Sequence, residues 1–97
     1  MSLMDIALRT GVPLADIESF IAGSVPKALA DRLGVALLNL QEFVEQGEVS
    51  ANLAHRLGTS MAAAEELGQA LGKEGRVGLV LGVLLGAKLS RAAEAGR

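Results

Sequence analysis

The side chains that could do chemistry are few and poorly placed for it. The chain of 97 residues has no cysteine and one histidine, His55, which excludes disulfides, thiolate metal sites and cysteine nucleophiles. His55 has no second histidine with which to hold zinc, and no serine lies in a Gly-x-Ser-x-Gly motif. The adjacent carboxylates Glu65 and Glu66 are typical of a solvated helix face. We therefore assign no catalytic, metal-binding or cofactor-binding residue, and we predict that the protein is not an enzyme.

The composition limits the fold to one small helical domain. A chain of this length buries only about 60–70% of the surface that its unfolded form exposes. Apolar residues make up 51% of the chain, but aromatic residues make up only 2%, namely Phe20 and Phe43. A core built from leucine, alanine, valine and isoleucine favours packed helices over a sandwich or a barrel.

Glycines at regular intervals predict where the helices end. Six of them follow stretches with helical apolar spacing, where glycine takes the left-handed conformation at little cost: Gly11, Gly23, Gly34, Gly47, Gly58 and Gly72. Four hydroxyl side chains are expected as N-caps: Ser2, Ser24, Ser50 and Thr59. The predicted helices cover residues 3–10, 14–22, 26–33, 37–46, 51–57, 60–71 and 76–95, and no window has the alternation of a strand. The predicted fold class is all-α.

The first six predicted helices form three repeats. The segment from Ile6 to Val12 is matched by Leu29 to Val35 and by Leu53 to Thr59, and each copy contains Ala-x-Arg-x-Gly. A single helical hairpin cannot bury its apolar face, so the three units must pack on one another. The expected architecture is a bundle of short helix-turn-helix hairpins, about residues 3–23, 26–47 and 51–72. Residues 73–97 follow as a glycine-striped apolar helix, either in the same domain or as an oligomerisation segment.

An alanine four residues before a turn glycine, with apolar residues on both sides, is typical of the helix-turn-helix. On this spacing, residues 3–47 resemble the lambda-repressor-like (XRE/Cro-type) domains. Residues 5–23 match the two central helices of that family, and Ala28 to Phe43 resembles the helix that closes the domain with its following turn. The resemblance implies a DNA-binding repressor or antitoxin that dimerises.

The second helix of each repeat lacks the cations that such a function requires. A helix that reads DNA presents Arg, Lys, Gln, Asn or Ser to the groove, whereas Asp16 and Glu18 would be repelled by phosphates. The candidate partner-binding or DNA-reading residues are Asp16, Glu18, Ser19, Asn39, Gln41 and Glu42. We favour a protein partner, possibly one with a basic surface, over DNA.

The C-terminal segment is apolar around its whole circumference if it is helical. Such a helix is buried in a core, inserted at a membrane surface, or paired with another chain, and small residues at four-residue spacing let two backbones approach closely. The candidate self-association face comprises Gly78, Gly82, Gly86, Val77, Leu81 and Leu85. We expect a homo-oligomer, with a central core helix and membrane-surface contact as the alternatives.

Charge and hydropathy indicate the setting in which the protein works. Residues 1–48 carry a net charge of −4 and residues 49–97 a net charge of +2, a polarity that favours head-to-tail association or an acidic partner for the basic end. The uncharged stretch from Val77 to Ala87 would span only about 16 Å as a helix, against roughly 30 Å for a bilayer core. We predict a cytoplasmic, non-enzymatic helical regulator that acts by protein–protein interaction and self-association.

Overall fold

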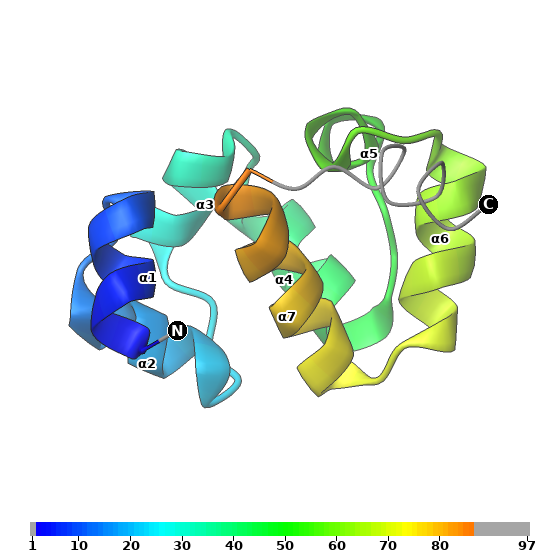
Figure 1. The fold of residues 1–97 in the computed structure, drawn as a ribbon. Coiled ribbons are helices and arrows are strands. Elements are labelled where there is room, and N and C mark those ends of the chain that lie inside the picture. The colour runs from blue at the N-terminus through cyan, green and yellow to red at the C-terminus, as the bar shows by residue number, and fades with distance from the viewer. Residues whose placement is uncertain (1, 87–97) are drawn as a thin grey trace, which may run out of the picture.

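The computed structural model describes residues 2–86 and is all-helical over that range, as the sequence predicts. Seven helices follow one another: α1 (Leu3–Thr10), α2 (Leu14–Ile21), α3 (Lys27–Leu33), α4 (Leu37–Gln46), α5 (Ala51–Leu57), α6 (Met61–Ala70) and α7 (Lys73–Leu84). The first six form three hairpins that succeed one another across the molecule, and α7 crosses in front of α4 (Figure 1). The first six elements lie within one or two residues of their predicted bounds.

The turn inside each hairpin is built on a left-handed glycine. Gly11, Gly34 and Gly58 have φ of 74°, 86° and 81°, a conformation that glycine adopts without steric cost. In the second and third hairpins the same bond closes the turn, from Val35 N to the carbonyl of Ala30 and from Thr59 N to the carbonyl of Ala54, each 3.1 Å. The repeated Ala-x-Arg-x-Gly spacing therefore corresponds to a repeated backbone turn.

The first hairpin closes its turn differently. The Val12 N–H donates to Oγ1 of Thr10 at 3.3 Å, and the Thr10 hydroxyl donates to the carbonyl of Ile6 at 2.7 Å. Thr10 is almost fully buried, and its hydroxyl satisfies an amide that would otherwise lack a partner near the core. A side chain thus replaces the backbone bond of the other two turns.

The helix starts agree with the sequence at two of the four expected caps. Ser2 and Ser50 accept hydrogen bonds from the amides of Asp5 and Leu53. The cap of α6 is Ser60 rather than Thr59, because the hydroxyl of Ser60 accepts from the amide of Ala63. The cap of α3 is not Ser24, since that helix begins after Pro26.

Gly72 also differs from expectation. It has φ −79° and ψ 179° and precedes α7 as its N-cap residue, while α6 ends in an extended Leu71. The last of the six regularly spaced glycines therefore starts a helix instead of ending one, which is why α7 begins at Lys73 and not at residue 76.

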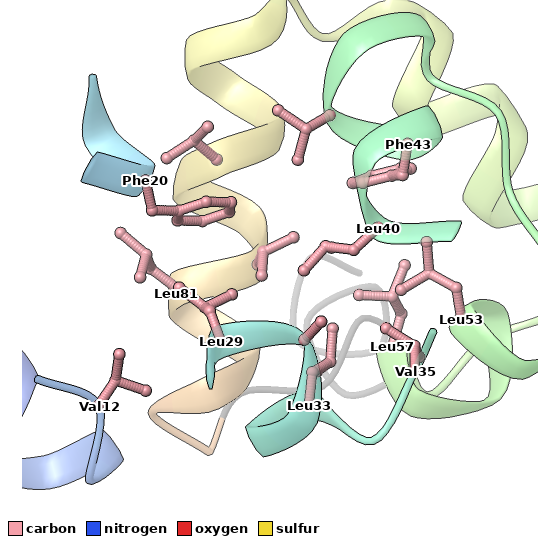
Figure 2. Close-up of a cluster of buried hydrophobic side chains, with 14 of the residues drawn as sticks. Val12, Phe20, Leu29, Leu33, Val35, Leu40, Phe43, Leu53, Leu57 and Leu81 are labelled. Carbon is pink, nitrogen blue, oxygen red and sulfur yellow. The ribbon is translucent and has the colours of Figure 1, made fainter. Parts of the chain in front are cut away.

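The core runs through all three hairpins and into α7. Figure 2 shows Phe20 of α2, Leu29 of α3 and Leu81 of α7 on one side of the cluster, and Leu40, Phe43, Leu53 and Leu57 on the other. The repeat alanines Ala7, Ala30 and Ala54 are buried, as expected where paired helices cross. The radius of gyration of 12.4 Å is close to the roughly 12–13 Å of a compact chain of this length, so the hairpins close around a core and do not extend into a solenoid.

Two glycines and one arginine fix the contact between α4, α6 and α7. A methyl group on Gly47 would lie 2.9 Å from the carbonyl oxygen of Gly68, so the two backbones touch. Beside this contact Arg76 of α7 donates from Nε to the Gly68 carbonyl at 2.7 Å and from Nη1 to the Val44 carbonyl at 3.0 Å. The guanidinium thereby satisfies carbonyls near the ends of two helices and ties α7 to both.

The inner side of α7 belongs to the core. Val77, Val80 and Leu81 are buried, Val80 completely, and the helix packs on both α2 and α4. Within the described chain, the structure therefore supports the core-helix alternative for this side of α7. Its end is a correction to the sequence prediction, because α7 stops at Leu84 and Gly86 has φ 109°. Gly86 thus follows the helix and lies on no helical stripe, and the predicted continuation over 87–95 falls outside the described residues.

Candidate interaction surface

Two exposed arginines of the described chain lie against the glycine turn of the preceding hairpin. A methyl group on Gly11 would lie 3.9 Å from Cζ of Arg32, and one on Gly34 would lie 3.0 Å from Nε of Arg56. Each of these arginines lies over the glycine turn of the preceding hairpin, near a helix C-terminus whose partial negative charge attracts a cation. In the second and third hairpins, the arginine of the repeat motif therefore has a structural role, because it contacts the preceding hairpin.

The second helices of the hairpins carry no basic residue. In α2 the side chains of Glu18 and Ser19 are exposed and Asp16 is half-buried. The surface of this helix is thus acidic and polar where a DNA-reading helix would be basic.

The candidate residues on α4 are less accessible. Asn39, Gln41 and Glu42 are all half-buried, because they flank the stripe of Leu40, Phe43 and Val44 that faces the core. The α2 and α4 candidates belong to different hairpins that both pack on α7. Of the two predicted helices, α2 presents the more open surface.

The predicted self-association face of α7 divides between two sides of the helix. Val77 and Leu81 point into the core, and Leu85 is half-buried at the C-cap. By contrast, a methyl group on Gly78 or on Gly82 would meet no atom within 4 Å. The glycine side of α7 therefore faces solvent, whereas Val77 and Leu81 are mostly buried against the core and reach the surface only beside Gly78.

A groove runs between the C-terminal end of α2 and the first two turns of α7. It consists of two adjoining hollows of about 300 and 280 Å³ that share Ile21, Glu74 and Val77. Gly78 and Leu81 extend its apolar floor, and Lys73 lies at the other end. The Lys73 Nζ lies 2.7 Å from Oε1 of Glu45, an exposed ion pair, whereas Glu74 is exposed beside the groove.

The first hairpin has exposed apolar side chains that were not predicted from the sequence. Met4 and Leu8 of α1 are 51% and 75% exposed, and Ile21 of α2 is 45% exposed. A comparison of the three repeats could have shown that Leu8 is exposed. Leu8 occupies the variable position between the repeat alanine and arginine, where the other units have the polar residues Asp31 and His55.

Residues 2–86 contain neither a metal-binding cluster nor a membrane-spanning helix. The structure brings together no group of three or more His, Asp or Glu side chains that could bind a metal ion in this part of the chain. His55 is exposed on α5. None of the helices described is both long enough and apolar enough to cross a bilayer.

Comparison with protein-family models, with curated proteins and with solved structures finds no significant match to this chain.

Proposed function

We propose that the protein is a small non-enzymatic regulator that acts by binding other proteins and by self-association. The observation that carries this proposal is the surface of the first hairpin, where both helices expose large apolar side chains, Met4 and Leu8 on α1 and Ile21 on α2. Apolar surface that a small domain leaves in water favours burial against another macromolecule. The groove beside Ile21 supplies a concave surface of the same character.

The charge beside this surface favours a basic partner. Asp16 and Glu18 lie on α2, which has no lysine or arginine to offset them. Opposite charge on a partner would speed its approach and fix its orientation more than it would raise affinity. A nucleic-acid-binding protein with a basic surface is a partner of this kind.

The test of self-association is sedimentation velocity on the full chain over the micromolar range. We expect the weight-average mass to rise with concentration to at least that of a dimer. A mass that stays at one chain throughout would contradict the self-association half of the proposal. Partner binding is tested with wild-type and Glu18→Lys baits compared by quantitative mass spectrometry, in which we expect basic partners to be lost from the variant.

The resemblance to repressor domains supplies the alternative function, which is DNA binding. Phosphate contacts provide most of the affinity of such proteins, and α2, α4 and α6 contribute no cation. We expect fluorescence anisotropy to show no sequence-selective complex at nanomolar protein and physiological salt. A selective complex whose affinity falls steeply with salt would replace our proposal with the repressor function.

A further inference from the structure

The first hairpin has an apolar ridge that the fold does not need. Met4 and Leu8 lie one turn apart on one side of α1 and are both exposed. The equivalent positions of the other two hairpins hold small, polar or charged residues, which are Lys27 and Asp31, and Ala51 and His55. The helices α3 and α5 form and pack with those residues. Folding of a hairpin therefore does not require apolar side chains at these two positions. Single exposed leucines are common on proteins, so the comparison among repeats is what sets this pair apart.

The groove between α2 and α7 has the shape and polarity to receive such a ridge. Its apolar floor is formed by Ile21, Val77 and Leu81 and extends over Gly78, where an added methyl group would meet nothing within 4 Å. A glycine at this point lets another helix approach the backbone of α7 closely.

We propose that the Met4–Leu8 ridge of one copy of the protein docks in the α2–α7 groove of a second copy. This inference rests on the proposed self-association and names the two surfaces that make it. Arg9, exposed next to Leu8 on α1, supplies a cation beside the ridge, and Glu74, exposed on α7, supplies a carboxylate that borders both hollows of the groove. Opposite charges at matching positions of the two surfaces would fix the orientation in which they dock.

The ridge is tested with residues taken from the protein's own second repeat. Met4→Lys with Leu8→Asp gives α1 the side chains that α3 has at the same positions and leaves the net charge unchanged. We expect this double variant to keep the circular dichroism and melting temperature of wild type, and to weaken self-association in sedimentation by about tenfold or more. Leu38→Asp is the matched control, because Leu38 is 62% exposed on α4 and lies on neither surface. This control should associate as wild type does.

The groove is tested with two glycines of the same helix. Gly78→Leu places a side chain in the groove, whereas Gly82→Leu places the same side chain one turn further on, beyond the groove. At both positions a methyl group would meet no atom within 4 Å. We expect Gly78→Leu to be folded and monomeric and Gly82→Leu to associate as wild type does.

A mixing experiment joins the two tests. The double variant lacks the ridge but keeps the groove, and Gly78→Leu lacks the groove but keeps the ridge. Mixed at equal concentration, the two variants should associate more strongly than either does alone and form a one-to-one complex with the mass of a dimer, because one intact ridge and one intact groove remain.

Each other outcome overturns a defined part of the inference. If Gly78→Leu associates as wild type does while the double variant does not, α1 pairs with something other than the groove. If neither variant weakens association, both surfaces are wrong while the proposed self-association stands. If wild type is monomeric across the micromolar range, the proposed self-association and the inference both fail.

Discussion

At the scale of single residues, the Arg76 side chain joins three helices by hydrogen bonds. It lies on α7 and donates to carbonyls of α4 and α6 at 3.0 and 2.7 Å. Arg76→Met keeps the aliphatic part of the side chain but leaves two partly buried carbonyls without their donor, which costs about 1–3 kcal/mol of unfolding free energy. Urea denaturation measures this loss. Arg9→Met, on the exposed face of α1, should change stability by less than about 0.5 kcal/mol, and an equal effect of the two variants would deny Arg76 this role.

Two helical glycines should respond in opposite ways to the same substitution. Alanine is favoured over glycine inside a helix by about 0.5–1 kcal/mol. At Gly82 the added methyl group meets nothing within 4 Å, so Gly82→Ala should stabilise the protein by about that amount. At Gly68 the methyl group would lie 3.0 Å from both the Gly47 carbonyl oxygen and Phe43 Cε1, and the forced separation of α4 and α6 should make Gly68→Ala destabilising. Thermal melting of the two variants distinguishes these effects, and stabilisation by Gly68→Ala would contradict the close contact.

At the scale of the helices, the crossing inside each hairpin depends on a small residue. Ala30 is fully buried where α3 packs on its neighbours. Ala30→Leu should overpack this crossing and lower the free energy of unfolding by about 1–3 kcal/mol. Ala28→Leu on the exposed side of α3 adds the same atoms without a clash and should be close to neutral. Equal melting temperatures for the two variants would show that the crossing has room for a larger side chain.

The sequence repeat made most helices predictable. The positions that depart from the repeat were not predictable. Gly11, Gly34 and Gly58 follow the same motif, and each has the predicted left-handed turn. Gly72 follows an apolar stretch as they do, but it precedes a charged turn and begins α7, a choice that depends on where α7 packs. The outward direction of Gly78 depends in the same way on which side of α7 the core occupies.

The interaction surface was less predictable than the helices. Asp16 and Glu18 were recognisable as candidates from their charge alone. Arg76 was not, because its two acceptors are main-chain carbonyls 8 and 32 residues away in sequence, and backbone acceptors leave no mark on a sequence. The groove beside Ile21 likewise exists only because the end of α2 lies next to α7.

At the scale of the whole molecule, α7 packs on two hairpins that are distant from it in sequence. It packs on α2 of the first hairpin and on α4 of the second (Figure 1), and its Val80 is completely buried among residues of the common core. The inner side of α7 is therefore committed to holding one chain together, and the part of α7 that remains accessible to another chain borders the groove beside α2.

This division of α7 predicts how the molecule unfolds. Val80→Ala removes two buried methyl groups and leaves a cavity, which should cost about 2 kcal/mol and lower the melting temperature by about 8–16 °C for a domain of this size. Because α7 contacts two hairpins, the loss should weaken the whole fold, so the far-ultraviolet circular dichroism should still melt in one transition. Leu38→Ala removes more apolar surface from an exposed position and should shift the melting temperature little. A variant Val80→Ala that loses α7 at low temperature while the hairpins melt at the wild-type temperature would show instead that the six hairpin helices form a complete core, and that α7 is an appended segment whose apolar side is available to another chain.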